Sequence, residues 1–272
     1  MKQPAGIAGV FDRAADTYDA VGVPWFRPIA AWLVAALAPQ PGERALDVGC
    51  GRGAALLPLA EGVGVDGSVL GVDLAPRMVA ATARDTAHLP QVSVEVGDAA
   101  SLRLAASSYD VVASSLVLFF LADPAAALRS WVELLVPGGR LGITTFAGQD
   151  PHWAAVDQVF LPYLPEGMRD ARTSGAKGPY ASDAGVADLL RGAGLQQVQT
   201  LTRTLPVVLA DADQWHEFSW SHGQRAMWEA VPQGDRPQVR ALAEQALAGA
   251  RDGAGRIHFT QDVRITLGQA AG

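Results

Sequence analysis

The residues of this chain that most strongly suggest chemistry lie in the run LDVGCGRG, at residues 46–53. Asp47 is followed at two-residue steps by Gly49, Gly51 and Gly53, directly after a short apolar run that is typical of a strand. Glycine allows the backbone to approach a ligand closely and to adopt positive φ angles between a strand and a helix. The run also fits the relaxed pattern G-x-G-x-x-A of dinucleotide-binding turns. It therefore predicts a turn that binds a nucleotide-like ligand.

Two classes of ligand fit such a turn. A nicotinamide or flavin dinucleotide would place its pyrophosphate at the N-terminus of the following helix. S-adenosylmethionine carries no phosphate, and the glycines would then admit its methionine part. A carboxylate at Asp47 would repel a pyrophosphate but can bind the ammonium group of a methionine moiety, directly or through water. The pattern favours S-adenosylmethionine and leaves the dinucleotide as an alternative.

Two further carboxylates follow later predicted strands. Asp73 ends the second strand, where a carboxylate can accept hydrogen bonds from both hydroxyl groups of a ribose, in NAD and S-adenosylmethionine enzymes alike. Asp98 follows the third strand, where its side chain and the Ala99 N–H could bind an adenine amino group and ring nitrogen. A Gly-Asp pair after a strand is also common in turns that bind no ligand. The place of Asp98 in the series favours a binding role.

The composition limits the partners of the chain. Its 272 residues, 49% of them hydrophobic, suit one large α/β domain and exclude general disorder. The net charge is −7 and no run of Lys or Arg occurs, so we expect no nucleic-acid substrate. Cys50, the single cysteine, is expected to be a small residue of the binding turn without a redox role. Without a signal peptide or a membrane span in the sequence, we expect a cytoplasmic monomer or homodimer with no membrane partner.

The elements that must position these residues alternate between strands and helices. Strands are predicted at residues 44–48, 68–73, 92–96, 109–115 and 139–146, and helices from about residue 54, at 76–86 and at 123–135. Apolar, β-branched strands that alternate with helices predict a doubly wound, mainly parallel sheet. Its ligand should lie at the carboxyl ends of the strands.

Segments on both sides of this core are expected to cover the site. The predicted elements there are helices at 7–19, 24–38 and 182–194, strands at 197–204 and 256–267, an irregular segment at 148–181 and two helical patterns within 211–251. We expect a single domain made of a helical lid at 1–40, a cofactor-binding core at 41–147, caps over the substrate at 148–181 and 208–253, and a final strand and tail at 254–272.

Five motifs occur in a characteristic order: LDVGCGRG, VLGVDLAPRM, VEVGDAASL, YDVVASSLVLFFLADPAAAL and the Pro-Gly-Gly of LVPGGRLGITTF. By these motifs, residues 43–146 resemble class I S-adenosylmethionine-dependent methyltransferases, and the helix FDRAADTYD resembles them more weakly. The resemblance is greatest to the branch of ubiquinone and menaquinone biosynthesis methyltransferases and bacterial small-molecule (natural-product) methyltransferases. It implies a Rossmann-like seven-stranded sheet with an antiparallel last strand, and S-adenosylmethionine as cofactor.

The resemblance also implies roles for individual residues. Those expected to bind the cofactor are Tyr18, Asp47, Gly49, Cys50, Gly51, Asp73, Leu74, Met78, Asp98, Ala99, Ser114 and Leu116. Ser114 and Leu116 would lie beside the methyl-bearing sulfur, and Tyr18 near the methionine end. The chain lacks the Asp/Asn-Pro-Pro-Tyr run of methyltransferases that act on amino groups of nucleic acids or protein glutamine, and it has no assignable acidic cluster of the Mg-dependent catechol type. We therefore expect transfer without a metal.

Residues outside the core would hold the methyl acceptor. The candidate bases for a protonated nucleophile are His152, His216 and His222. The candidate walls of an acceptor pocket are Trp25, Phe26, Trp153, Trp215 and Trp220, although each of these aromatic residues could instead pack in the core.

The sequence thus predicts methyl transfer from S-adenosylmethionine to an oxygen, nitrogen or carbon atom of a small molecule, in secondary or quinone-like metabolism. Two alternatives stay open. The fold could bind S-adenosylmethionine without methyl transfer, in a cyclase-like or structural role, because the motifs indicate cofactor binding and not turnover. A more remote alternative is an NAD(P) oxidoreductase.

Overall fold

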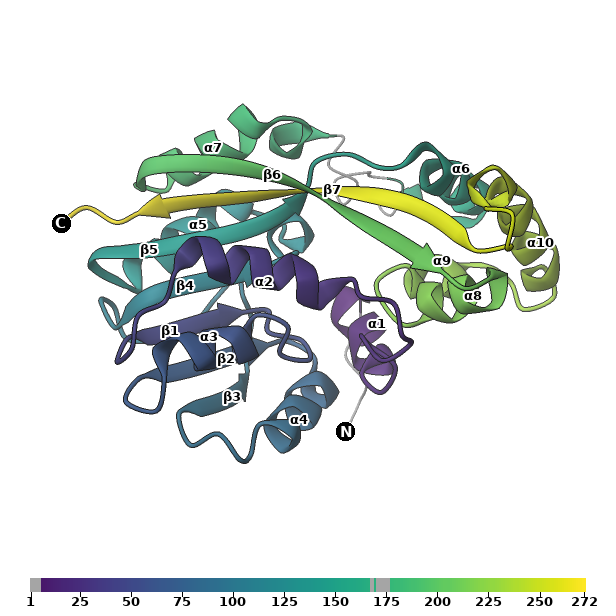
Figure 1. The fold of residues 1–272 in the computed structure, drawn as a ribbon. Coiled ribbons are helices and arrows are strands. Elements are labelled where there is room, and N and C mark those ends of the chain that lie inside the picture. Colours follow the sequence, from purple (N-terminus) through teal and green to yellow (C-terminus); the bar gives the residue numbers. More distant parts are fainter. Residues whose placement is uncertain (1–5, 167–168, 170–176) are drawn as a thin grey trace.

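The computed structural model describes residues 6–166, 169 and 177–272. Seven strands form one sheet at its centre, in the order β3-β2-β1-β4-β5-β7-β6 (Figure 1). The strands are β1 (Arg44–Val48), β2 (Ser68–Asp73), β3 (Val92–Val96), β4 (Tyr109–Ser115), β5 (Leu135–Phe146), β6 (Gln196–Leu209) and β7 (Ile257–Gln269). β7 is antiparallel to both of its neighbours, and the other neighbouring pairs are parallel. The predicted doubly wound, seven-stranded sheet with an antiparallel last strand is confirmed.

Helices follow most strands, as the alternating pattern predicts. They are α1 (Gly6–Ala14), α2 (Phe26–Leu37), α3 (Leu56–Val63), α4 (Pro76–Asp85), α5 (Pro124–Glu133), α6 (Pro151–Phe160), α7 (Asp183–Gly192), α8 (Ala212–Trp220), α9 (Arg225–Ala230) and α10 (Arg236–Ala246). Their starts have local chemical causes: the Asp123 and Ser182 side chains accept hydrogen bonds from backbone N–H groups in the first turns of α5 and α7. In the described residues, no helix combines the length and apolar character needed to cross a bilayer.

The sheet has a hydrophobic core on each face, because successive strand residues point to opposite sides. Ala45 of β1 packs in a cluster with Leu33 of α2 and Leu56 of α3. Leu46, the next residue along β1, packs in a larger cluster that includes Leu128 of α5. Helices on both sides therefore hold β1 and β4 at the centre of the molecule, with their carboxyl ends at one edge.

β6 and β7 extend beyond the other strands, and α6, α8, α9 and α10 gather around this extension (Figure 1). We call these four helices the cap. The sequence pattern ends the sixth strand at residue 204, whereas β6 continues to Leu209 through Pro206, which pairs with Thr260. Proline is tolerated there because β6 is an edge strand, where a missing N–H need not break the ladder. The sequence predicts an irregular segment at 148–181 and two helical patterns within 211–251. The structure has helix α6 in the first range and three helices, α8, α9 and α10, in the second.

Candidate functional site

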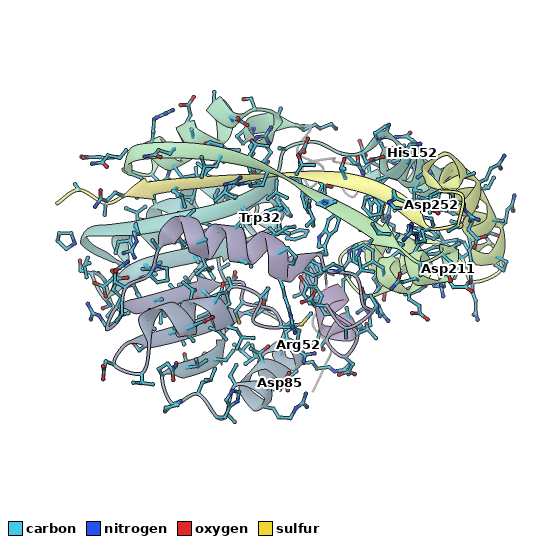
Figure 2. The ribbon with its side chains drawn as sticks, in the orientation of Figure 1. Trp32, Arg52, Asp85, His152, Asp211 and Asp252 are labelled. Carbon is cyan, nitrogen blue, oxygen red and sulfur yellow. The ribbon has the colours of Figure 1, made fainter. Side chains whose placement is uncertain are left out.

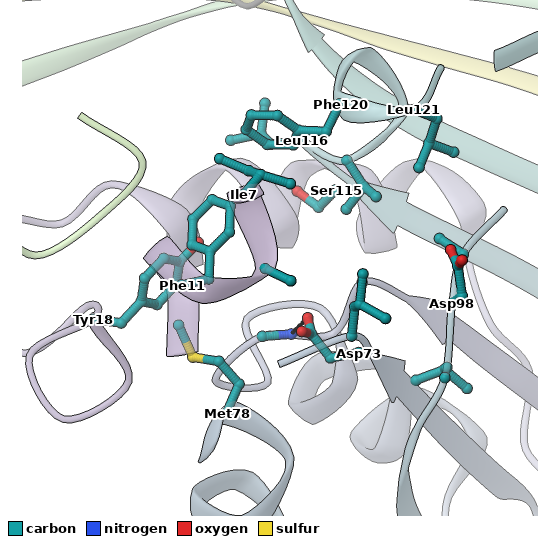
Figure 3. A pocket seen from close by; sticks show the side chains of 18 residues that line it. Ile7, Phe11, Tyr18, Asp73, Met78, Asp98, Ser115, Leu116, Phe120 and Leu121 are labelled. Atoms are coloured by element: carbon teal, nitrogen blue, oxygen red, sulfur yellow. Dashed lines mark hydrogen bonds between the residues drawn. The ribbon is translucent and has the colours of Figure 1, made fainter. Parts of the chain in front are cut away.

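A cavity of about 120 Å³ lies at the carboxyl ends of β1, β2 and β4, covered by α1 (Figure 3). A single water needs only about 10–15 Å³ by this kind of measure, so the space suits an organic ligand. The glycine-rich turn after β1 forms its floor, with Gly49 and Gly51 in the wall. This is the edge at which doubly wound sheets bind their ligands.

The turn requires glycine for two reasons. Gly49, Gly51 and Gly53 have φ angles of 76°, 50° and 82°, a region that L side chains rarely adopt. In addition, a Cβ on Gly49 would lie 2.3 Å from a methyl carbon of Val117. The Gly49 N–H also donates to the Val72 carbonyl at 2.7 Å, which ties the turn to β2. The backbone is therefore exposed to the cavity in a fixed shape.

Asp73 connects the turn to the end of β2. One carboxylate oxygen accepts from the Gly51 N–H and the other from the Ala75 N–H, both at 2.9 Å. Burial raises the pKa of Asp73, and these N–H donors partly offset that effect. Each oxygen keeps a further lone pair, so the carboxylate can hold the turn and still accept from two ligand hydroxyls. The side chain fits the ribose of a nucleoside ligand.

Asp98 and Ala99 form the far end of the cavity, beyond β3. One Asp98 oxygen accepts from the Ala100 N–H at 2.8 Å, and the Ala99 carbonyl accepts from the Trp131 indole N–H at 2.8 Å. These bonds fix the loop backbone against α5. The arrangement suits a flat base with donor and acceptor groups on its edge.

Asp47 lies behind the cavity wall rather than in it. Its side chain is only 1% exposed, and it accepts a hydrogen bond from the backbone N–H of Leu56 at the start of α3. The Oδ2 atom is buried without a partner in the described residues. Burial, together with the nearby Asp73 carboxylate, raises the pKa of Asp47 to about 7. A cation near this pair would relieve their repulsion.

Helix α1 closes the cavity on the side opposite the glycine-rich turn. Phe11 contacts the ring of Tyr18, with centroids 6.0 Å apart, and that of Phe120 at 5.6 Å. Asp12 accepts from the Arg77 backbone N–H at 2.8 Å, and this bond joins α1 to α4. In contrast, α2 packs against the sheet and α3. Only the first of the two N-terminal helices therefore covers the site.

The structure brings most of the predicted cofactor residues together. Nine of them line the cavity: Tyr18, Gly49, Gly51, Asp73, Leu74, Met78, Asp98, Ala99 and Leu116. Asp47, Cys50 and Ser114 do not. The Cys50 sulfur points back toward Gly71 of the sheet, and burial raises its pKa well above the usual range. The Ser114 hydroxyl donates to the Val48 carbonyl at 2.9 Å inside the sheet, so Ser115 is the hydroxyl residue on the cavity.

Nine further residues that line the cavity were not predicted from the sequence. They are Ile7, Ala8, Phe11, Val72, Gly97, Ser115, Val117, Phe120 and Leu121. Ile7 and Phe11 are spaced by four positions on one face of α1, a signal that was available. The run LVLFFL after β4 was another, because an apolar loop at the active edge of a sheet needs something to contact.

The tryptophans predicted to form the wall of an acceptor pocket lie outside the lining of this cavity. Trp25, Trp153 and Trp215 are 5%, 9% and 0% exposed and belong to the main hydrophobic core. Trp220 lies between the guanidinium groups of Arg225 and Arg236, each 5.3 Å from its ring centroid. None of these tryptophans is among the described residues that line the cavity. Large aromatic side chains had more area to bury in joining the cap to the sheet.

Phe26 lies closer to the cavity than these tryptophans. Its ring stacks on Tyr18 with centroids 4.2 Å apart, and Tyr18 lines the cavity. On its other side, Phe26 meets the ring of His222 edge to face at 6.1 Å. The three aromatic rings join the cofactor cavity to the cap.

The other two candidate bases, His152 and His216, lie away from the cavity. His152 is on α6, in the cap, whereas Arg52 and Asp85 mark the glycine-turn side of the molecule (Figure 2). The His152 Nδ1 is 3.1 Å from the Asp150 carboxylate at the start of its helix. The His216 Nε2 accepts from the Trp220 indole N–H at 3.1 Å, and burial lowers its pKa. Both rings are engaged in contacts within the cap. Among the described residues, no cluster of three or more His, Cys, Asp or Glu has the arrangement of a metal site.

Known proteins are similar to this chain in sequence. Residues 46–143 match the family model described as "Methyltransferase domain". The chain is 39% identical to nocamycin O-methyltransferase of Saccharothrix syringae, in an alignment that covers 96% of this chain and 97% of the relative. It is 38% identical to aklanonic acid methyltransferase DauC of Streptomyces sp. strain C5, over 60% of this chain and 79% of the relative.

A solved structure agrees at the level of the fold. The YcgJ protein of Bacillus subtilis superposes with a TM-score of 0.59 at 18% identity, covering 90% of this chain and 99% of that one. The match to nocamycin O-methyltransferase extends over nearly the whole of both chains. Because the family's cofactor is S-adenosylmethionine, the exposed glycine backbone and Asp73 have a ligand that fits them. The chain therefore belongs to the S-adenosylmethionine-dependent methyltransferases.

Proposed function

We propose that this enzyme methylates an oxygen atom of a small molecule of secondary metabolism. The proposal rests on the similarity to nocamycin O-methyltransferase over 96% of the chain. The cavity agrees with it, because its walls fit a nucleoside at one end and are apolar at the other. Aklanonic acid methyltransferase DauC, a second relative, supports an acidic, polyketide-like acceptor.

The cavity residues support a division of labour within the proposed core, residues 41–147. Asp73 would bind the ribose, Asp98 and Ala99 the adenine, and the glycine-rich turn the methionine part. The unpartnered Oδ2 of Asp47 supports a contact with the ammonium group, directly or through a water in the wall. The proposed acceptor caps, residues 148–181 and 208–253, would close the other end.

S-adenosylmethionine supplies an activated methyl group on a sulfonium when it is bound. The protein therefore has mainly to align a nucleophile with the S–CH3 bond, and alignment alone can supply on the order of 7–11 kcal/mol of the barrier reduction. Apolar side chains at the acceptor end, Ile7, Phe11, Phe120 and Leu121, would hold a flat molecule there and exclude water.

Isothermal titration and a product assay test this proposal. The protein should bind S-adenosylmethionine and S-adenosylhomocysteine but not NAD(P). It should form S-adenosylhomocysteine with aklanonic acid or another oxygen acid in a panel of acids, phenols and amines. Cofactor binding without product from any acceptor would favour the alternative of a fold that binds the cofactor and does not transfer methyl. Binding of NAD(P) alone would reject the family's cofactor for this chain.

A further inference from the structure

A buried hydrogen-bonding atom without a partner lies in the loop between α8 and α9. The loop contains His222, whose ring lies between those of Phe218, at 4.4 Å, and Phe26, at 6.1 Å. The His222 Nε2 is buried and has no hydrogen-bond partner in the described residues. Buried polar groups in native proteins are nearly always paired, so this atom calls for a partner that the described part of the chain does not provide.

The protonation of the ring follows from its other nitrogen. The Gln224 backbone N–H donates to the His222 Nδ1 at 3.3 Å, so Nδ1 must present its lone pair. In a neutral imidazole the proton is then on Nε2. Burial among apolar rings lowers the pKa of His222 to about 3, which keeps the ring neutral in any ordinary buffer. The unpartnered atom is therefore an N–H donor.

The loop that carries this donor is held in place by a buried polar cluster. The Gln224 side chain donates to one Asp157 oxygen at 3.2 Å, and the Gln149 side chain donates to the other at 2.5 Å. Asp157 is on α6 and Gln149 follows β5, so three separate segments meet at this carboxyl group. The imidazole is thereby oriented before any ligand arrives.

The same loop lies directly behind the wall of the cofactor cavity. A Cβ on Gly223 would be 3.5 Å from the Phe11 ring, and Phe11 lines the cavity. On the other side, Phe26 separates His222 from Tyr18, which also lines the cavity. His222 does not itself line the cavity, so an acceptor seated there reaches Nε2 when the Phe11 or Phe26 ring moves aside, and its body then stays in apolar surroundings.

We propose that the His222 Nε2–H donates a hydrogen bond to the acceptor oxygen that receives the methyl group, and that this oxygen arrives as an anion. The inference rests on the proposed function and specifies its substrate class: a carboxylate or an acidic enolate. A lone pair of the oxyanion forms the new O–CH3 bond, the S–CH3 bond breaks, and its electron pair stays on sulfur. The charges of sulfonium and oxyanion cancel, so no proton has to move.

This assignment replaces the predicted role of His222 as a general base. A base needs a free lone pair, and the Nδ1 lone pair already accepts from Gln224 while Nε2 carries the proton. Phe11, the cavity residue that contacts this loop, is apolar and cannot serve as an alternative base. An ionised acceptor removes the need for one.

Two substitutions separate a donor from a packing residue. His222→Phe keeps an aromatic ring between Phe26 and Phe218 but removes the N–H, whereas His222→Gln restores a side-chain N–H donor. With aklanonic acid as the acceptor, we expect His222→Phe to lower kcat/KM about ten- to hundredfold and His222→Gln to recover much of that loss. His88→Phe, at an exposed position between α4 and β3, is the matched control and should retain the parent value. Both His222 variants should bind S-adenosylhomocysteine as the parent does.

A measurement without turnover distinguishes this inference from the proposed function. Aklanonic acid added to the S-adenosylhomocysteine-loaded protein should shift the imidazole 15N and N–H signals of His222, identified by their loss in the Gln variant. Unchanged signals, no binding of the acid, or equal activity of His222→Phe and the parent would each overturn the inference. Absence of product with every acceptor, despite a shifted His222 signal, would instead count against the proposed methyl transfer.

Discussion

At the scale of single residues, we expect the buried carboxyl of Asp47 to lose its proton when the cofactor binds at a pH below about 7. It lies close to Asp73, and burial with that neighbour raises its pKa to about 7. Its Oδ2 has no partner in the described part of the chain. An ammonium group near Oδ2 would favour the ionised form and lower the pKa, so cofactor binding should release a proton from Asp47 when the pH is below about 7.

The affinity for S-adenosylmethionine should therefore depend on pH. With a pKa near 7, about one molecule in ten has Asp47 ionised at pH 6, so Kd should be about tenfold weaker at pH 6 than at pH 8. Asp47→Asn should bind more weakly at pH 8 and lose most of this dependence. Isothermal titration at both pH values measures the effect, and Asp188→Asn, on the exposed side of α7, is the control. Equal pH slopes for the parent and Asp47→Asn would reject the contact.

The neighbouring Ser114 and Ser115 offer a second prediction at this scale. Ser114 is buried and bonded to the Val48 carbonyl, whereas Ser115 lines the cavity and lies 3.0 Å from the Thr144 hydroxyl. Ser114→Ala should lower the free energy of unfolding by about 1–3 kcal/mol, because it leaves a buried acceptor unpaired, and should leave Kd unchanged. Ser115→Ala should alter Kd for the cofactor or KM for the acceptor with a smaller loss of stability. Urea denaturation and titration of both variants give the comparison, and a reversed pattern would contradict the placement.

The serine pair shows what the sequence leaves open at a binding site. The motif predicts that a serine at the end of the fourth strand faces the ligand. It does not determine which of two neighbouring serines does so, because successive strand residues point to opposite faces of the sheet. Leu116 adopts a positive φ of 59°, and this turn decides which side chains reach the cavity. Asp73 and Asp98 were predictable because Asp73 is the last residue of β2 and Asp98 follows the end of β3 by two residues.

At the scale of elements, α1 is a lid held from two sides. Arg13 forms an ion pair with Glu229 of α9, and Glu229 also pairs with Arg225 at 2.9 Å. Arg77 of α4 pairs with Asp16, just beyond the end of α1. Since α1 covers the cavity, these contacts oppose the opening through which the cofactor and its product must pass.

Loosening this lid should speed product release. Exposed ion pairs contribute about 0–1 kcal/mol each, so Arg13→Ala should raise the dissociation rate of S-adenosylhomocysteine by up to about fivefold. The effect should shrink in high salt, where the parent pair is already screened. Stopped-flow measurement of release by the parent, Arg13→Ala and the control Arg191→Ala, whose ion pair with Asp188 lies within α7, checks this expectation. Identical rates for all three would show that α1 does not limit release.

The first four strands of the core were predictable to the residue, while β5, which starts at Leu135 rather than at residue 139, and the elements of the cap were not. The strands β1 to β4 coincide with the predicted ranges, because each is a short apolar run bounded by turn residues. The length of β6 depends instead on β7, which begins only at Ile257 and pairs with β6 as far as Leu209. Such distant pairing leaves no local signal. In the helices of the cap, large buried aromatic residues lie close together in the sequence. Their spacing therefore does not show the 3.6-residue period of a helix clearly.

At the scale of the whole molecule, aromatic packing joins the cap to the sheet. Trp25, before α2, meets Trp153 of α6 with centroids 6.1 Å apart, and Phe259 of β7 meets Trp153 at 4.7 Å. Segments from the start, middle and end of the chain thus share one core. The stability of the whole protein should therefore depend on this region.

Trp153→Ala should destabilise the whole protein rather than affect KM alone. Removal of a tryptophan from a well-packed core costs about 3–5 kcal/mol of unfolding free energy. Trp32→Ala, at a half-buried position on α2, should cost less. Urea denaturation followed by circular dichroism measures both. If Trp153→Ala left the unfolding midpoint unchanged but raised KM for the acceptor, the residue would be part of the acceptor pocket after all.

The position of β7 between β5 and β6 has a consequence for how the protein is made. β7 follows β6 and the cap helices in the sequence, yet among the described residues β6 is hydrogen-bonded in the sheet through β7 alone. Until β7 has left the ribosome, the glycine-rich turn and the four strands around it can already be complete, whereas β6 and the helices anchored beside it still lack their central strand. The part of the protein that holds the cavity can therefore take shape first during synthesis, and the cap must wait for β7.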